Sequence, residues 1–301
     1  MKVRTRFAVA TLTALALLAT ACGDDDSSST ETTAAADAIP AVAKNDAAIA
    51  LLPEAYASKT TLVVGLDATY PPSEFIAEDG ATIIGFDADL MVAIAQALGM
   101  TADLQNAGFD AIIPGISSGK FDVGASSFTD TKEREQTVDF VTYFSAGTNF
   151  YVAANGGVSV DGLDSLCGHS VAVQKGTIQE EYATTQDAAC KDAGKEGVEV
   201  VSFDAQTDAN LAVSSGRAEV GFADSPVAAY IASSSNGQLK VSGTPFDTAP
   251  YGLALAKDGL APAVLEALKG LIADGTYAKI LAKWGVSDGA ITEPVINGAI
   301  S

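Results

Sequence analysis

Short apolar runs alternate with amphipathic segments over most of the chain. Residues 61–66 (TLVVGL) are apolar and rich in β-branched side chains, with polar residues on both sides, which predicts a buried strand. Residues 87–98 place Leu90 and Ile94 on one face of a helix, and Gly99 follows as a helix stop. This alternation of strands and helices predicts an α/β fold with mixed, mostly parallel sheets.

The same patterns predict the remaining elements. Strands are predicted over residues 100–104, 123–125, 149–154, 170–174, 198–203, 220–223 and 251–256. Helices are predicted over residues 43–57, 110–118, 131–137, 178–193, 208–215, 226–233, 261–273 and 277–284, with Pro53 and Pro114 interrupting the first two. In α/β folds ligands bind beyond the carboxyl ends of strands, so polar residues that follow strands are candidates for a site.

Residues 1–21 have the pattern of a secretory signal peptide. A start with three basic residues precedes an apolar run that is too short and too rich in small residues to span a membrane. Residues 18–23 (LATACG) resemble a bacterial lipobox, which predicts lipidation of Cys22 after cleavage. An ordinary secretory signal with an unmodified Cys22 is the alternative.

The segment that follows Cys22 is acidic and rich in serine and threonine. Residues 23–37 (GDDDSSSTETTAAAD) offer almost no apolar surface to bury, so residues 22–42 are predicted to form a disordered tether. The predicted location is therefore extracytoplasmic, with the folded part anchored to the outer face of the bacterial cell membrane by lipid on Cys22.

Charge narrows the range of partners. The chain holds 38 acidic and 17 basic residues, for a net charge of −21, and 48% of its residues are hydrophobic. Such a chain can bury a large core, but it offers little to neutralise a row of phosphates, which argues against a nucleic-acid partner. Cleavage after residue 21 would leave Arg134 and Arg217 as the only arginines.

Three cysteines remain to be explained. If Cys22 carries lipid, Cys167 and Cys190 form an even pair in an oxidising compartment, which favours a disulfide, with two buried free thiols as the alternative. The chain has no CxxC or HxxxH motif and a single histidine, His169. We therefore predict neither a metal site nor a cofactor.

Four groups of polar and aromatic residues lie at or near the ends of predicted strands. They contain Asp67 and Tyr70; Phe109; Ser126, Ser127, Thr129 and Arg134; and Asp224. The guanidinium of Arg134 suits a carboxylate, and Asp224 can accept hydrogen bonds from an ammonium group. Two aromatic rings complete a site for an α-amino acid. The alternatives are a helix N-cap for Asp224, a core position for Phe109 and a solvated helix surface for Arg134.

Residues 60–286 resemble the family 3 extracellular solute-binding proteins, the amino-acid receptors of ABC importers. The matching stretches are VVGLDATYPPSEF, IIGFDADLMVAIAQALG, FDAIIPGISSGKFDVGASSFTDTKEREQTVDF, LCGHSVAVQKGTIQEEY, VGFADSPVAAY, YGLALAK and DGTYAKILAKWGV. The resemblance implies a two-lobed periplasmic-binding-protein-like fold of type II with a two-strand hinge. Lobe 1 is expected from residues 43–147 and 252–301, and lobe 2 from residues 148–251.

The resemblance also implies a set of ligand-binding residues. The set is Asp67, Tyr70, Phe109, Ser126, Ser127, Thr129, Arg134, Thr177, Gln179 and Asp224. Arg134 and Thr129 are expected to hold the α-carboxylate of the ligand, and Asp224 its α-ammonium. Tyr70 and Phe109 are expected to enclose its side chain. In the remaining roles, Ser127 and Thr177 support the carboxylate, Gln179 lines the second lobe, and Asp67 faces the polar end of the ligand.

The expected function is that of a monomeric receptor, which closes on a polar or basic amino acid and delivers it to the permease subunits of an ABC transporter. Two departures from the family pattern, Ser73 in place of phenylalanine and Ile178 in place of threonine, affect ligand identity. A dehydratase-like enzyme on the same fold, with Asp67 as its acid, is the alternative. The sequence shows no nucleophile–base pair that would favour it.

Overall fold

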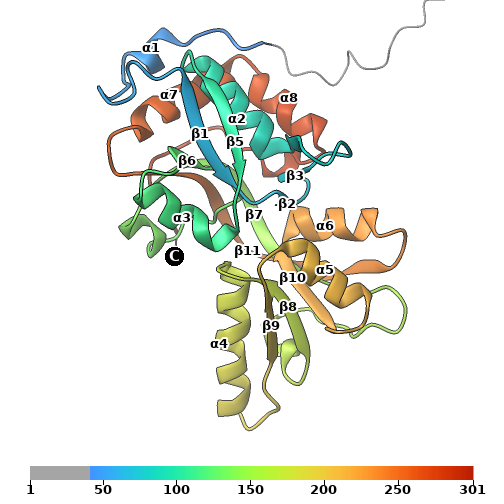
Figure 1. Cartoon of the computed structure of the whole chain (residues 1–301). Helices are drawn as coiled ribbons and strands as arrows, with labels where there is room; N and C mark the ends of the chain where they lie inside the picture. Colours follow the sequence, from blue (N-terminus) through green and yellow to red (C-terminus); the bar gives the residue numbers. More distant parts are fainter. Residues whose placement is uncertain (1–40, 301) are drawn as a thin grey trace, which may run out of the picture. The chain divides into compact units, whose positions relative to one another are not determined.

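The computed structural model describes residues 41–300 (Figure 1). The predicted signal peptide, Cys22 and nearly all of the predicted tether lie outside the described residues. Within 41–300, no helix combines the length and the apolar character that a membrane span requires.

The described residues form one eight-stranded sheet and one three-stranded sheet. The large sheet has the order β5-β1-β6-β11-β7-β10-β8-β9, and the small one β2-β3-β4. The strands are β1 Thr61–Leu66, β2 Thr69–Tyr70, β3 Glu74–Ile76, β4 Ile83–Ile84, β5 Thr101–Asn106, β6 Val123–Gly124, β7 Asp139–Ala153, β8 Ser170–Gln174, β9 Glu199–Phe203, β10 Val220–Asp224 and β11 Leu239–Leu255. The helices are α1 Asp46–Ile49, α2 Phe86–Ala97, α3 Phe109–Ser117, α4 Ile178–Asp192, α5 Gln206–Ser214, α6 Ser225–Ser234, α7 Ala261–Ala273 and α8 Thr276–Lys283, with 3-10 turns η1 Arg134–Gln136, η2 Leu163–Leu166 and η3 Ser287–Gly289.

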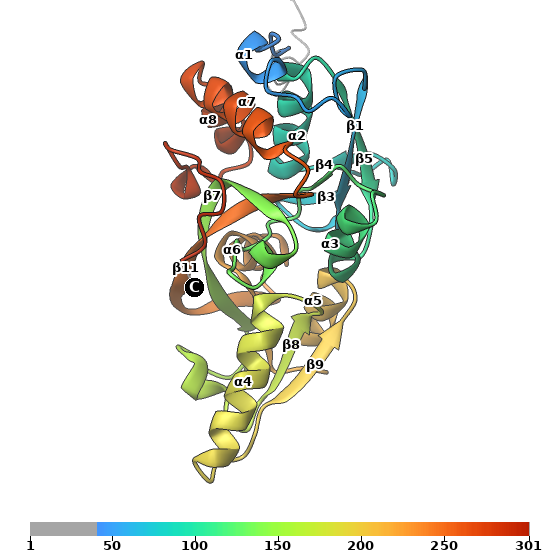
Figure 2. The ribbon, with the colours of Figure 1, turned by 90° about the vertical axis from the view of Figure 1, so that its left-hand side faces the viewer.

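Two long antiparallel strands, β7 and β11, connect the two ends of the large sheet (Figures 1 and 2). At one end β11 pairs with β6, and β1 lies parallel to β5 and β6. At the other end β7 pairs with β10, and β8 lies parallel to β9 and β10. We call the first group, with α2, α3, α7 and α8, the β1 lobe, and the second, with α4, α5 and α6, the β8 lobe. The expected hinge of two strands is therefore present, but it makes both lobes part of one continuous sheet.

The lobes have separate hydrophobic cores. In the β1 lobe, Leu90 and Ile94 of α2 are buried against β1 and α7, as their helical spacing predicts. In the β8 lobe, Phe150 of β7 packs against Phe222 of β10, with tilted rings whose centroids are 4.5 Å apart. Each fully buried side chain of this size contributes roughly 1.5–3 kcal/mol to folding. The expected lobe boundaries, 147/148 and 252, fall inside β7 and β11 and stay a prediction.

Three predicted helices differ from those in the structure. Helix α3 continues through Pro114, which costs one backbone hydrogen bond but leaves Ile112 and Ile116 buried in the core. The helix predicted over 131–137 is only the 3-10 turn η1, because this polar segment has almost no apolar face to pack before β7 begins. The helix predicted over 43–57 is reduced to α1.

The strand predictions fell short in two places. The strands predicted over 149–154 and 251–256 are the last parts of β7 and β11, whose earlier parts show no regular alternation of apolar and polar residues. The small sheet was not predicted, since its strands have only two or three residues each.

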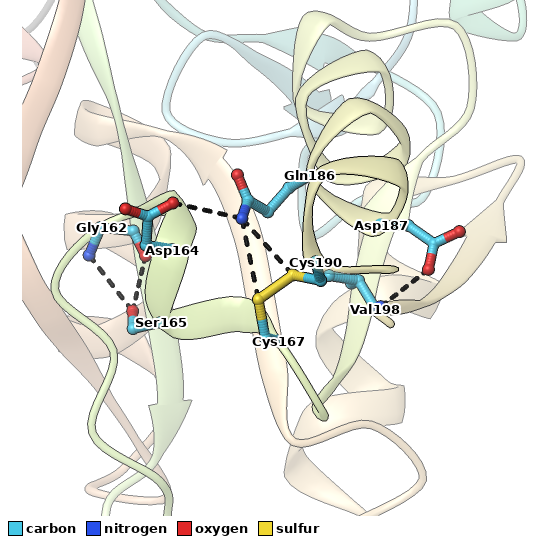
Figure 3. Close-up of a disulfide and its surroundings, with 8 residues drawn as sticks. All are labelled: Gly162, Asp164, Ser165, Cys167, Gln186, Asp187, Cys190 and Val198. Atoms are coloured by element: carbon cyan, nitrogen blue, oxygen red, sulfur yellow. Dashed lines mark hydrogen bonds between the residues drawn. A yellow bond between two sulfur atoms is a disulfide. The ribbon is translucent and has the colours of Figure 1, made fainter. Parts of the chain in front are cut away.

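Figure 3 shows a disulfide between Cys167, directly after η2, and Cys190 in α4. Their Cα atoms lie 5.6 Å apart. Gln186 lies beside the bridge: its Nε2 is 3.4 Å from the Cys190 sulfur and 3.3 Å from Oδ1 of Asp164. The bridge thus attaches α4 to the segment that precedes β8.

Removing this bridge should lower the free energy of unfolding. The two cysteines are 23 positions apart, and closing a loop of that length is worth about 3 kcal/mol in the chain-entropy model. We expect the double variant Cys167→Ser/Cys190→Ser to unfold at correspondingly lower urea concentration. Wild-type protein treated with a reductant serves as the matched control and should behave alike. An unchanged midpoint in both would contradict a stabilising role.

Candidate functional site

A small cavity lies where residues of both lobes meet. About 290 Å³ between its lining atoms, open solvent included, is not filled by protein. It is lined by Tyr70, Phe109, Ser126, Ser127, Thr129, Arg134, Gln174, Thr177, Ile178, Gln179 and Asp224. Nine of the ten residues expected to bind the ligand are therefore brought together, and Asp67 is the exception.

The loop after β6 supplies three hydroxyl groups to the lining, on Ser126, Ser127 and Thr129. Ser127 has a left-handed backbone with φ of 50°, which is uncommon for a residue other than glycine. Its N–H donates to Oδ2 of Asp87 over 2.8 Å, and this bond helps to hold the unusual conformation. The buried Ser127 hydroxyl makes no hydrogen bond to another described residue.

Arg134 is the only basic side chain in the lining. Its Nη1 donates to the carbonyl of Thr129 over 2.9 Å, and its Nη2 donates to the carbonyl of Gly176 in the β8 lobe over 3.0 Å. The guanidinium carbon lies 5.6 Å from the ring centroids of Phe109 and Phe128, which stack on each other. Desolvation lowers the pKa of Arg134, but an arginine with so high an ordinary pKa keeps its charge. The site thus contains a fixed cation with further N–H groups to donate.

Asp224 is the acidic side chain of the lining. It ends β10, and its carboxylate accepts from the Tyr70 hydroxyl over 3.0 Å and from Nε2 of Gln179 over 2.8 Å. Burial raises the pKa of Asp224 to about 6, although these hydrogen bonds and the charge of Arg134 act in the opposite direction. Asp224 precedes α6, but its side chain makes no capping hydrogen bond there. Its carboxylate therefore belongs to the cavity and not to the helix.

Thr177 and Gln179 stand at the start of α4. The Thr177 hydroxyl caps this helix by accepting from Glu180 N over 3.2 Å, and it donates to the carbonyl of Gln174 over 2.7 Å. Gln179 is buried and also donates to the Thr148 hydroxyl over 3.1 Å. Both side chains are thus fixed by the protein before any ligand is considered.

Asp67 lies next to the lining but does not form part of it. Its carboxylate accepts from the Thr69 hydroxyl over 2.6 Å, from Phe109 N over 2.9 Å and from Nε2 of Gln174 over 2.9 Å. Gln174 belongs to the other lobe, so this last bond links the two. Burial raises the pKa of Asp67, and its three hydrogen bonds act in the opposite direction. The expected contact between Asp67 and the polar end of a ligand stays a prediction.

Sequence reasoning missed two residues around the cavity and gave a third no role. Gln174 is the last residue of a strand that had been predicted, so the rule that sites lie at carboxyl strand ends could have found it. Phe128 lies inside the recognised segment after β6 and supports Phe109 from behind. Ile178, which departs from the family pattern and has no predicted role, also lines the cavity.

Residues 62–287 match the model of the bacterial extracellular solute-binding proteins, family 3. The chain belongs to this family. Among curated relatives of this solute-binding protein, the arginine-binding protein ArgT of Corynebacterium glutamicum is 36% identical over 250 residues, which are 82% of each chain. The L-cystine-binding protein TcyJ of Escherichia coli K12 is 29% identical and covers 76% of this chain and 84% of its own.

Solved structures agree with this assignment. An ancestral arginine-binding protein bound to arginine has a TM-score of 0.69 and 39% identity, over 75% of this chain and 98% of its own. An ancestral amino-acid-binding protein described as a precursor of cyclohexadienyl dehydratase has a TM-score of 0.69 and 34% identity, over 77% of this chain and 98% of its own. The expected type II fold with two lobes is confirmed.

The contacts of Asp67 generate a test of its structural role. Replacing Asp67 by alanine leaves Phe109 N without its buried acceptor and removes one of the two acceptors of Gln174 Nε2, which should cost about 3 kcal/mol of unfolding free energy. Asp79 is the matched control, because it also accepts from backbone N–H groups but is exposed. Its alanine variant should lose only about 0.5 kcal/mol. If urea denaturation shows equal losses of unfolding free energy in the two alanine variants, the buried contacts of Asp67 stabilise the protein no more than the exposed contacts of Asp79.

Proposed function

We propose that this extracellular solute-binding protein binds an α-amino acid with a polar or basic side chain and delivers it to the permease subunits of an ABC transporter. One observation carries the proposal: Arg134 and Asp224 present opposite charges to the same small cavity. Amino acids carry the complementary pair of charges on adjacent groups.

The energetics of burial favour a zwitterion over a ligand of single charge. A charge that is taken out of water without a partner costs several kcal/mol, and Arg134 and Asp224 both stand in a desolvated position. A carboxylate at Arg134 and an ammonium at Asp224 would satisfy both groups with one molecule. The free hydroxyl of Ser127 would add one more hydrogen bond to the carboxylate.

The rest of the cavity supports a polar or basic side chain. Tyr70 and Phe109 supply aromatic surface for an aliphatic stem, while Gln174 and the nearby Asp67 add polar groups. The named ligands of the relatives agree, since they include arginine and cystine, and a similar ancestral protein has been solved with glutamine. Arginine is the first ligand to test.

We further propose that the site binds its ligand without transforming it. One structural relative is a precursor of a dehydratase, and such an enzyme would need a carboxylic acid facing the substrate. Asp67, the expected acid, already accepts three hydrogen bonds and does not line the cavity. This arrangement supports a receptor.

The remaining parts of the proposal concern how the receptor is presented to its transporter. We propose that residues 1–21 are removed, that lipid on Cys22 anchors the chain to the outer face of the cell membrane, and that residues 22–42 act as a tether. We also propose that the protein works as a monomer, with lobe 1 from 43–147 and 252–301 and lobe 2 from 148–251.

A thermal-shift panel of the common amino acids tests the proposed function. The protein is unfolded and refolded first, so that it carries no ligand from its expression host. A ligand at 100 times its dissociation constant adds about 2.7 kcal/mol of stability, and we expect arginine to give such a shift. No shift with any amino acid would overturn the proposal.

The same assay tests the assignment of Arg134. Lysine keeps the charge but loses the planar fork, so Arg134→Lys should weaken arginine binding roughly 100-fold, or about 2.7 kcal/mol. Arg217→Lys is the matched control, because Arg217 is the other arginine of the described chain and is exposed. Equal affinities in the two variants would contradict the assignment.

Protonation of Asp224 should weaken arginine binding at acidic pH. Its pKa is raised to about 6, and the protonated carboxyl group has no charge to pair with the ligand ammonium. Affinity for arginine should therefore be constant above pH 7 as far as Asp224 is concerned, and fall up to tenfold per pH unit below about 6. Titration calorimetry between pH 5 and 7 measures this. Asp224→Asn should bind weakly without that acid limb, and a wild-type affinity that does not change over this range would contradict the prediction.

A further inference from the structure

Two carboxyl groups are fully buried directly behind the cavity. Glu74 of β3 and Asp87 of α2 both have no exposed surface. The N–H of Asp87 donates to the carbonyl of Ser73 over 2.9 Å, which places the start of α2 beside the residue that precedes Glu74. Each carboxyl group shifts the pKa of the other, so the two are close neighbours. Neither residue lines the cavity.

One oxygen of each carboxyl group holds the ligand-binding loop after β6. Oε1 of Glu74 accepts from the Ser126 hydroxyl over 2.7 Å. Oδ2 of Asp87 accepts from Ser127 N over 2.8 Å and from the Tyr143 hydroxyl over 2.7 Å. The pair therefore fixes the two serines that line the cavity, including the left-handed backbone of Ser127.

The other oxygen of each group has no protein partner within residues 41–300. These atoms are Oε2 of Glu74 and Oδ1 of Asp87. None of the ion pairs in this part of the chain includes either residue. If both groups were ionised, two negative charges would face each other in a dry environment with no cation beside them. A single proton between them removes one charge and gives the unpaired oxygens a hydrogen bond.

The surroundings favour retention of that proton. Burial and the charge of Asp87 raise the pKa of Glu74 well above its ordinary value, and Asp67, after β1, raises it further. Burial raises the pKa of Asp87 to about 6, against hydrogen bonds from Tyr143 and Ser127. The other titratable neighbours are tyrosines, Tyr70 on β2 and Tyr143 on β7, with Tyr251 on β11 packed against the latter.

We propose that Glu74 and Asp87 share one proton and that this singly charged pair positions Ser126 and Ser127 for ligand binding. Neither residue touches the ligand in this proposal. Both act through the serines, so they are positioning residues, and the proposal goes beyond the identity of the ligand.

The proposal has a definite pH dependence. Groups whose pKa is raised by folding bind more protons in the folded state, so stability is highest below their unfolded-state pKa and falls as pH rises. For Asp87 the fall lies between about 4 and 6, and the more strongly shifted Glu74 extends it to higher pH. This direction is opposite to the acid limb expected for ligand binding at Asp224.

Amide substitutions test the shared proton. In Glu74→Gln the amide N–H₂ replaces the shared proton as a donor to Asp87, and in Asp87→Asn it becomes a donor to Glu74. In the double variant two N–H₂ groups face each other without an acceptor. A shared proton therefore predicts two tolerated single variants and one damaging double variant.

We expect each single variant to lower the melting temperature by about 5 °C or less and the double variant by more than about 15 °C, measured without ligand. Glu74→Gln should also flatten the decline of melting temperature with pH. At pH 7, the infrared difference spectrum of wild type minus Glu74→Gln should contain the C=O band of a protonated carboxyl group.

Three results would overturn the proposal: additive losses in the double variant, a single amide variant as damaging as the double one, or an infrared difference without that band. Because these measurements need no ligand, they are independent of the proposed function. Affinity for L-arginine at pH 7 then tests positioning: Glu74→Gln should stay within about threefold of wild type, and Glu74→Ala should lose at least tenfold. Equal affinities of wild type and Glu74→Ala would overturn the positioning role.

Discussion

Ionisable groups that leave water must find partners, and this constraint shapes the centre of the molecule. Arg134 and Asp224 meet at the cavity, with Asp67 beside it and Glu74 and Asp87 behind it, and burial shifts the pKa of each. Each group forms hydrogen bonds with donors or acceptors that come from a different element. The backbone N–H of Phe109 donates to Asp67, and Gln179 donates to Asp224. The carbonyl of Gly176 accepts from Arg134. The geometry of the cavity is largely the outcome of these pairings.

The sheet makes the pairings possible. Strands β1 and β6 end at one side of the cavity, and β8 and β10 end at the other. Polar residues at the carboxyl ends of these strands therefore lie around the same cavity. Only β7 and β11 continue through both lobes. A connection of two strands has few contacts to change when the lobes move, whereas each lobe keeps its own core. This division allows the distance between lobes to change without disturbing either core.

Much of this could be predicted from the sequence, because the signals are local. Asp224 ends β10, Tyr70 follows β1 closely, and Arg134 lies in the polar segment between β6 and β7. The strands themselves are visible as apolar runs. What was missed depends on contacts between distant segments. The hydrogen bond between Gln174 and Asp67 joins residues that are 107 positions apart, and no periodic pattern in the sequence predicts it. The helix through Pro114 was misjudged for a related reason, since tertiary burial of its apolar face outweighed a local signal.

The hydrogen bonds that cross the cavity have a consequence for affinity. The bond of Tyr70 to Asp224 and the bond of Arg134 to Gly176 satisfy the same charged groups that a zwitterion would engage, and the bond of Gln174 to Asp67 lies beside them. A ligand that enters must replace some of these bonds, so the net free energy of binding is smaller than the sum of the contacts it makes. The same bonds keep charged side chains in position when the cavity is empty, which reduces the ordering that binding requires. A receptor that must also release its ligand to a transporter needs specificity more than extreme affinity, and matched charges supply that specificity.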